Sequence, residues 1–133
     1  MTTWTVAISV SIAAVLGFTL DAGRVLRARS EAYGTAAAAA RFGASRLDER
    51  VYLTEDRAVL DPDAARQAID DFLETEGYTA LPGFSRTITV DELTVTVRIQ
   101  HHVEALSILD VGTLNIDVTA TAEAIQVDPA ALP

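Results

Sequence analysis

The chain begins with an apolar run that leads without interruption into a stretch rich in alanine and dotted with arginine. Residues 4–20 carry no charged side chain, and residues 21–47 consist mainly of Ala, Arg, Glu and Leu, all good helix formers. The weakest points are Gly34 and Gly43, each costing about 1 kcal/mol relative to alanine. The pattern predicts one continuous helix of about 45 residues, about 65 Å long.

The apolar run has about 17 residues and spans about 25 Å as a helix, at the short end of what crosses a bilayer core. Its Ser and Thr hydroxyls can bond back onto the helix. A secretory signal peptide has a basic start and a small-residue cleavage site, and residues 1–24 show neither. The run therefore predicts a retained single-pass membrane helix. A cleaved signal, or a buried helix of a wholly soluble chain, is the alternative.

Small side chains recur at helical spacing along the second part of this helix. Because small side chains let another backbone approach closely, the stripe predicts a face that packs against a second helix. The alternative is that the stripe packs on the chain's own sheet. The stripe consists of Ala22, Val25, Ala32, Ala36, Ala39 and Gly43.

A second, shorter helix is predicted after a linker or short extended segment at residues 48–60. Asp61 is a good N-cap, Pro62 suits the first helical position and Gly77 suits the stop. Between them the apolar residues fall on one face, as in an amphipathic helix. These residues are Ala65, Ala68, Ile69, Phe72 and Leu73.

Period-two alternation of Thr, Val and Ile predicts three strands, at residues 86–90, 93–101 and 113–127. Asp91-Glu92 is a two-residue connection that predicts a hairpin between the first two. Residues 103–112 are apolar without a period and predict a loop or short helix. The predicted core-facing side chains are Leu93, Val95, Val97 and Ile99 on the second strand and Leu114, Ile116, Val118, Ala120, Ala122 and Ala124 on the third.

These elements predict an α+β fold in which a three-stranded antiparallel meander is covered by helix. The predicted organisation is a transmembrane and stalk helix at residues 1–47, a linker at residues 48–60 and a small acidic domain at residues 61–133. The last strand is a candidate edge strand, where Asp117 and Glu123 would discourage open-ended sheet growth.

Charge is distributed unevenly along the chain, whose net charge is −9. Residues 1–60 carry seven Arg against six acids, and residues 61–133 carry three Arg against thirteen acids. An acidic surface repels phosphate backbones, which argues against nucleic-acid binding. Arg24, Arg27 and Arg29 follow the apolar run, and the positive-inside rule taken alone would place them in the cytoplasm. The absence of cysteine excludes disulfides and thiolate sites.

Few residues suggest chemistry. His101 and His102 are adjacent, and neighbours on a strand point to opposite faces, so a regular strand cannot bring both to one metal ion. The sequence contains no P-loop, no G-x-G-x-x-G and no calcium loop. Its acids occur where helix caps and turns need them. We therefore expect no enzyme activity, cofactor, metal or small-molecule substrate.

Several segments of the chain together resemble one known family. The D-x-G-R element at Asp21, Gly23 and Arg24 directly follows the apolar helix, and an Ala-rich segment follows it. The chain resembles the TadE/TadG-like pilus-assembly proteins, particularly the actinobacterial ones, over most of its length. The segments that carry the resemblance are residues 20–24, 27–32, 36–44, 93–97, 103–112 and 113–122.

The resemblance implies a membrane-anchored structural or assembly component, similar to a minor pilin or pseudopilin, of a Tad (Flp, type IVc) pilus. It implies a pilin-like fold, a helix in the membrane or pilus core, and an exported C-terminal domain at the cell surface. The implied partners are the lipid membrane, other pilin-like subunits and the pilus secretion machinery. The implied helix-packing residues are Asp21, Gly23, Arg24, Ala32, Ala36, Ala39 and Gly43.

The chain departs from the family's pattern at one position, because Thr5 stands where processed pilins carry Glu. The resemblance therefore does not extend to leader-peptidase cleavage or to Glu-guided docking into a filament. The alternative function is a membrane-tethered extracellular binding module that is not polymerised. Its sheet edge, or residues 103–112, would capture the partner.

Overall fold

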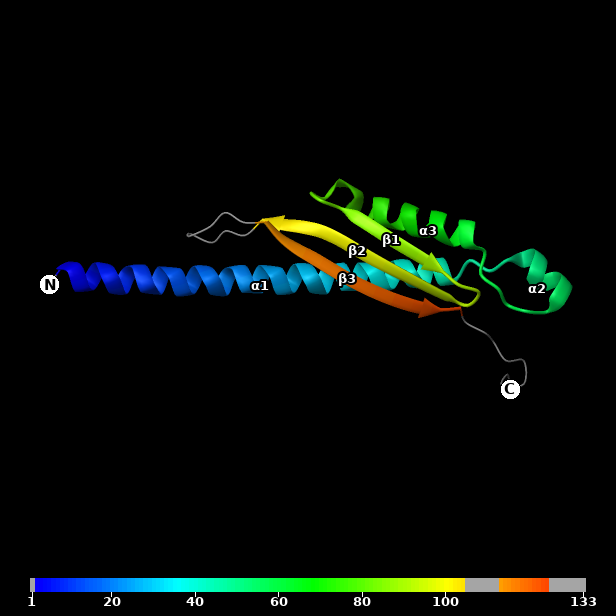
Figure 1. Cartoon of the computed structure of the whole chain (residues 1–133), viewed down its shortest axis with the longest axis horizontal. Helices are drawn as coiled ribbons and strands as arrows, with labels where there is room; N and C mark the ends of the chain where they lie inside the picture. Colours follow the sequence, from blue (N-terminus) through cyan, green and yellow to red (C-terminus); the bar gives the residue numbers. More distant parts are fainter. Residues whose placement is uncertain (1, 105–112, 125–133) are drawn as a thin grey trace.

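The computed structural model describes residues 2–104 and 113–124; for residues 2, 17, 18, 21, 104 and 113 it describes the backbone alone. It has the α+β class and the three-stranded antiparallel sheet that the sequence predicts. The elements in chain order are α1 (Thr2–Ala44), α2 (Glu49–Glu55), α3 (Pro62–Thr75), the 3-10 helix η1 (Tyr78–Ala80), β1 (Ser85–Val90), β2 (Thr94–Glu104) and β3 (Thr113–Glu123) (Figure 1).

The sheet has the order β1-β2-β3, with both neighbouring pairs antiparallel. The β2–β3 ladder runs from the pair Thr94 and Glu123 to the pair Glu104 and Thr113. Because side chains alternate along a strand, one face of β2 presents Val95, Val97 and Ile99, and all three are fully buried. The other face carries mainly threonine and charged side chains.

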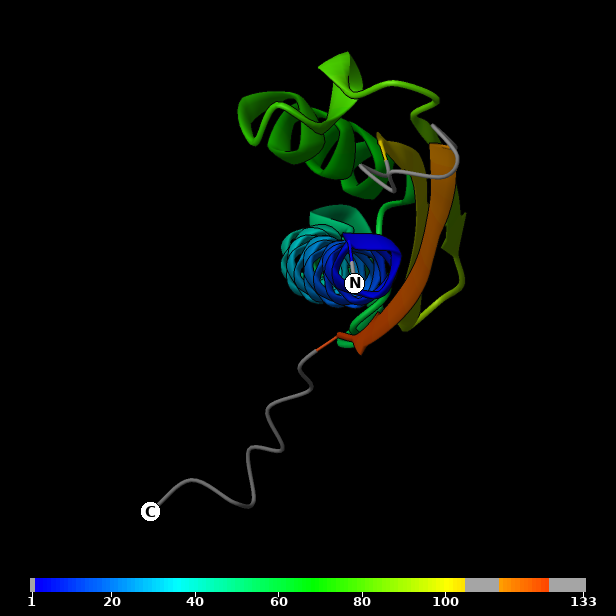
Figure 2. The same ribbon diagram turned by 90° about the vertical axis from the view of Figure 1, so that its left-hand side faces the viewer.

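Helices α1 and α3 lie on the same face of the sheet, which curves around α1 in the view along the helix axis (Figure 2). The core joins alanines of α1, Ile69 and Leu73 of α3, and the inward residues of β2 and β3. Helix α1 is thus part of the core of the acidic domain. The hydrophobic core therefore includes residues from both sides of the linker predicted at residues 48–60.

The local signals of α3 are confirmed. A side-chain oxygen of Asp61 accepts hydrogen bonds from the backbone N–H groups of Asp63 and Ala64, at 3.1 and 3.2 Å. Gly77 follows the helix with φ of 79°, a left-handed conformation that glycine adopts without strain. Burial of Ala65, Ile69 and Leu73 on one face fits the predicted amphipathic pattern.

The predicted linker at residues 48–60 contains a helix, so the prediction of a linker or extended segment is wrong for α2. Asp48 is its N-cap and accepts hydrogen bonds from the N–H groups of Arg50 and Val51, at 3.0 and 3.3 Å. The two ends of the segment at residues 48–60 lie next to each other, because Leu47 and Leu60 form a β-bridge. Leu60 also donates its N–H to the carbonyl of Glu92, which ties the return to the β1–β2 turn.

Three details of the strands differ from prediction. The β1–β2 connection includes Leu93, which is 36% exposed instead of core-facing, because β2 begins at Thr94. Leu114 is 41% exposed, since it pairs with Val103 near the far end of the ladder. Of the loop or short helix predicted at residues 103–112, the first two residues belong to β2 and the rest lies outside the described residues. The end predicted for the third strand, at residues 125–127, also lies outside them.

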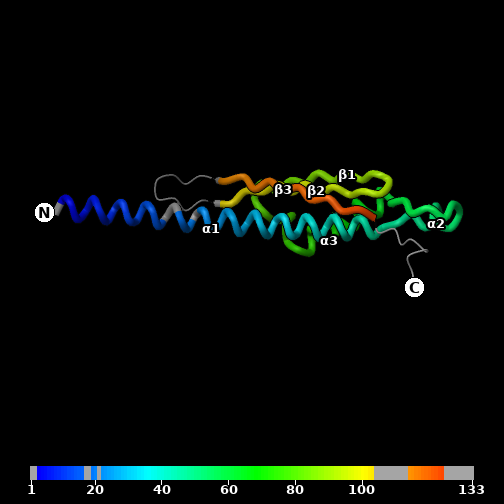
Figure 3. Tube along the Cα trace, turned by 90° about the horizontal axis from the view of Figure 1, so that it is seen from below, coloured from blue at the N-terminus to red at the C-terminus, as the bar shows by residue number. Residues whose placement is uncertain are grey.

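Only part of α1 is covered by the sheet. Its first turns extend beyond the described strands in two perpendicular views (Figures 1 and 3). We call residues 2–20 the projecting half and residues 25–44 the covered half. Both halves belong to one helix of 43 residues.

Candidate interaction surface on helix α1

The projecting half exposes large apolar side chains around most of its circumference. Successive residues of a helix turn by about 100°, so these side chains are spread over most sides of the helix. Each is more than half exposed, an unusual amount of apolar surface for a monomer in water. They are Trp4, Val6, Ile8, Val10, Ile12, Val15, Leu16 and Leu20.

Three hydroxyl groups of the projecting half bond back onto the helix. Ser9, Ser11 and Thr19 each donate to the carbonyl oxygen four residues earlier, at 2.7, 2.8 and 2.8 Å. The predicted back-bonding is therefore confirmed for these three hydroxyls, which need no water. Among the residues whose side chains are described, no helix has a stretch that is both long enough and apolar enough to span a membrane.

The covered half corrects the proposed role of the small-residue stripe. Ala32, Ala36 and Ala39 are fully buried within the chain itself. Gly43 lies so close to α3 that an added Cβ would meet Cδ1 of Ile69 at 2.7 Å. These four residues are buried within the chain, so they are not exposed to the helix of a second chain. Their small side chains let the chain's own sheet and α3 approach the helix.

The D-x-G-R element lies where the two halves of α1 meet. Arg24 is exposed, and a Cβ added to Gly23 would meet no atom within 4 Å. The side chain of Asp21 is outside the described part of the structure. The structure thus separates the predicted packing residues into a buried group on the covered half and an exposed group at the boundary.

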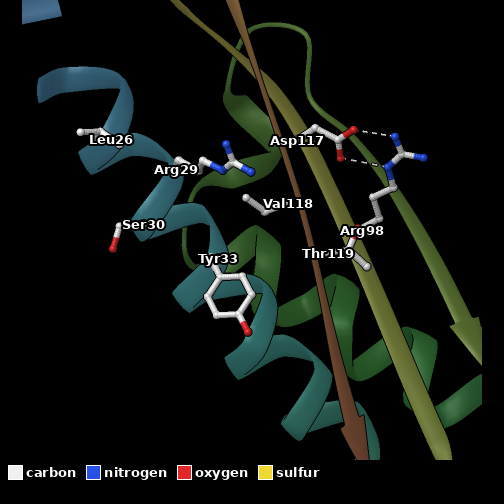
Figure 4. A pocket seen from close by; sticks show the side chains of 8 residues that line it. All are labelled: Leu26, Arg29, Ser30, Tyr33, Arg98, Asp117, Val118 and Thr119. Atoms are coloured by element: carbon white, nitrogen blue, oxygen red, sulfur yellow. Dashed lines mark hydrogen bonds and ion pairs between the residues drawn. The ribbon is translucent and has the colours of Figure 1, made fainter. Parts of the chain in front are cut away.

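A shallow groove of about 690 Å³ lies beside the free edge of β3 (Figure 4). Helix α1 contributes one wall and the edge of the sheet contributes the other. In Figure 4, Arg29 extends from α1 toward β3, and the Asp117 carboxylate lies on the other side of the strand, facing Arg98. The lining residues are Leu26, Arg29, Ser30 and Tyr33 of α1, and Arg98, Asp117, Val118 and Thr119 of the sheet.

An ion pair on the outer face of the sheet holds one side of this groove. Arg98 donates from Nε and Nη2 to the two carboxylate oxygens of Asp117, at 2.9 and 2.5 Å, and Gln100 donates to Oδ2 at 3.2 Å. The hydrogen bonds from Arg98 and then from Gln100 lower the pKa of Asp117 to about 2, and the charge of Arg29 acts in the same direction. Asp117 is therefore a fixed anion at neutral pH.

The two histidines lie on opposite faces of β2, as predicted. His101 is buried on the helix side, where its ring meets the ring of Tyr78 edge-on at 5.8 Å. His102 donates its backbone N–H to Pro82, and its ring lies against Gly83. Within the described residues, no three side chains of the metal-binding types are grouped to hold an ion.

No protein-family model, no curated protein and no solved structure matches the chain. The functional conclusion therefore rests on the geometry of α1 and on the resemblance of the sequence segments described above.

Proposed function

We propose that the chain is a membrane-anchored structural or assembly subunit, similar to a minor pilin, of a Tad (Flp) type IV pilus system. The observation that carries the proposal is the division of α1 into a covered half and a projecting apolar half. In a pilin-like subunit, one long helix would both anchor the chain and support its sheet, and the division of α1 supports such a role. The role is structural and needs no catalytic residue or cofactor.

The projecting half supplies the driving force for anchoring. Moving a fully exposed Val, Leu or Ile side chain into an apolar environment contributes about 1.5–3 kcal/mol. Several such side chains on one helix favour lipid, or the helices of sister subunits, over water. The acidic sheet domain would then stand clear of the membrane.

The contact between sister helices is assigned to the projecting half, since the alanines of the covered half are buried. Ala7, Ser11 and Ala14 form a narrow strip of small side chains between the bulky ones, spaced so that another helix could approach. Ser9 lies about 160° around the helix from Ser11, outside this strip. The two serines therefore provide a matched pair of test positions.

Cysteine cross-linking tests the proposal directly, because the chain has no cysteine of its own. In native cells, Ser11→Cys should give cross-linked partners in the membrane or filament fraction. Ser9→Cys should give fewer, and Thr87→Cys, on the exposed outer side of β1, none. A chain found wholly in the soluble fraction would contradict anchoring. A membrane-bound chain that forms no cross-link from either serine would contradict the packing of sister helices.

A second candidate function is a membrane-tethered binding module, favoured by the groove beside the free edge of β3. An extended segment could pair with this edge while its side chains contact Leu26 and Tyr33. The genes beside this one discriminate the two candidates. Secretion-ATPase and platform genes nearby favour the pilus subunit, and a lone gene favours the binding module.

A further inference from the structure

Three arginines surround α1 where the projecting half meets the covered half. Arg24, Arg27 and Arg29 are all exposed, and none forms an ion pair with any side chain that the structure describes. At about 100° per residue they point to different sides of the helix. We call these three residues the arginine band.

The position of the band is fixed by the packing of its neighbours. Val25 and Ala28, interleaved with the arginines, are partly buried and pack against the core. The band therefore occupies the first turns that the sheet holds in place, directly after the last exposed apolar residue of the projecting half, Leu20. Its distance from the apolar surface is set by a rigid helix.

Charge changes sharply on either side of the band. Residues 1–20 carry no charged side chain, one acid flanks the three arginines on each side (Asp21 and Glu31), and residues 61–133 carry thirteen acids against three Arg. Anionic surfaces therefore repel the sheet domain and attract the band. A nucleic acid would meet the same acidic domain and gain nothing from the apolar helix. A membrane surface satisfies both the apolar half and the cations.

We propose that the arginine band binds the phosphate groups of anionic lipid headgroups and thereby sets how deeply the projecting half inserts. This proposal rests on the anchoring role proposed above. A guanidinium donates two parallel hydrogen bonds to a phosphate, and its aliphatic stem packs along apolar surface while the charged end stays in the interface. Three arginines within about 8 Å along the helix axis would hold the helix within a narrow range of depth.

Flotation of the full-length protein with vesicles tests the proposal. Vesicles of phosphatidylcholine alone and with phosphatidylglycerol are compared at matched salt concentration. Each cation near an anionic surface strengthens partitioning by about fivefold, so the band should favour the anionic vesicles by about a hundredfold. Trp4, the only tryptophan, reports depth through quenching by brominated lipids.

The decisive variant is Arg24→Gln/Arg27→Gln/Arg29→Gln, and Arg41→Gln/Arg46→Gln/Arg50→Gln is its charge-matched control beyond the band. The first should lose the preference for anionic vesicles and shift the depth of Trp4, and the second should keep both. Circular dichroism verifies that each variant is folded.

The outcomes separate this proposal from the anchoring role. A wild-type chain that floats with neither vesicle overturns anchoring itself. A chain that floats equally with both overturns the band alone, as does a preference that survives in the triple variant. Abolition of the preference by inorganic phosphate, at the same ionic strength, would indicate a free-phosphate site instead. Self-association that depends on the band, without any lipid preference, would indicate a second copy as its partner.

Discussion

The two halves of α1 form one unbroken helix but have opposite surroundings. The covered half presents Ala32, Ala36 and Ala39 to the sheet and buries them completely. The projecting half presents Val, Ile, Leu and Trp side chains to its surroundings. The comparison shows that burial separates the two halves. Alanines occur where the sheet comes close to the covered half, and the large apolar side chains of the projecting half are more than half exposed.

The largest expected effect is overpacking of the covered half. Ala36→Leu/Ala39→Leu forces two larger side chains into space that the sheet fills, and each change should destabilise the fold by about 1–3 kcal/mol. The measurement is the free energy of unfolding of the full chain in mild detergent, from a urea titration.

The matched control is Ala13→Leu/Ala22→Leu, the same change at two exposed positions outside the covered half. It should alter the unfolding free energy by less than about 0.5 kcal/mol. Equal effects of the two double variants would mean that the halves do not differ in packing. Small effects of both would contradict the burial of the alanines.

Glycine to alanine changes should have opposite signs along the same helix. At Gly43 the new Cβ meets buried Ile69 and lies 3.3 Å from Cγ1 of Val95, so Gly43→Ala should cost about 1–2 kcal/mol. At Gly23 and Gly34 a Cβ meets nothing within 4 Å. Gly34→Ala should therefore stabilise the helix by about 0.5–1 kcal/mol through lower backbone entropy.

Urea unfolding of both variants provides the check. Gly34 lies within the covered half but on its exposed side, so the pair separates burial from position along the chain. Stabilisation by Gly43→Ala would show that Ile69 moves aside at little cost. The packing of α3 against α1 at Gly43 would then tolerate a larger side chain.

The sequence predicts best where a single residue type determines local geometry. Asp61, Pro62 and Gly77 delimit α3 through capping and backbone preferences that act within a few residues. The alternation of β2 predicts its buried face because Val95, Val97 and Ile99 need only the period of the strand. Such signals depend only on neighbouring residues, so the folded chain shows the local structure that they predict.

Features that depend on contacts between residues far apart in the chain cannot be predicted from such local signals. The alanine stripe predicts close packing, but whether the partner is a sister helix or the chain's own sheet depends on tertiary structure. The pair of Arg98 and Asp117 depends on the register of two strands, which the alternation within each strand does not give. Helix α2, with seven residues, is too short to show a helical period, although Asp48 is a recognisable cap.

Removing the caps tests which short helix supports the covered half. Asp61→Ala should destabilise the chain by about 1 kcal/mol, because α3 packs on α1 and loses two hydrogen bonds at its start. Asp48→Ala removes the same kind of cap from α2, which has no buried residue among those described. Its effect on global unfolding should be smaller, and hydrogen exchange should show local fraying of α2. A larger loss from Asp48→Ala would mean that the excursion at residues 48–60 contributes to the core.

The smallest expected effect is on the stability at low pH, through the interactions of Asp117 on β3 with Arg98 and with Arg29 of α1. The pKa of Asp117 is lowered from 3.8 to about 2 in the folded chain, so the folded state favours the carboxylate. The stabilisation is present above about pH 4 and is lost as the pH falls toward 2, and it is small because the pair is exposed. Asp117→Asn should remove this part of the acid dependence.

An NMR titration of the Asp117 carboxyl carbon separates the two arginines that act on it. Arg98→Gln should raise the pKa clearly, since it removes the largest cause of the shift, and Arg29→Gln should raise it slightly. Equal shifts would mean that the boundary of α1 is held against β3 as firmly as the strands are held to each other. No shift from Arg29→Gln would mean that solvent screens the charge of Arg29 from Asp117, which leaves that charge for the headgroups proposed to bind it.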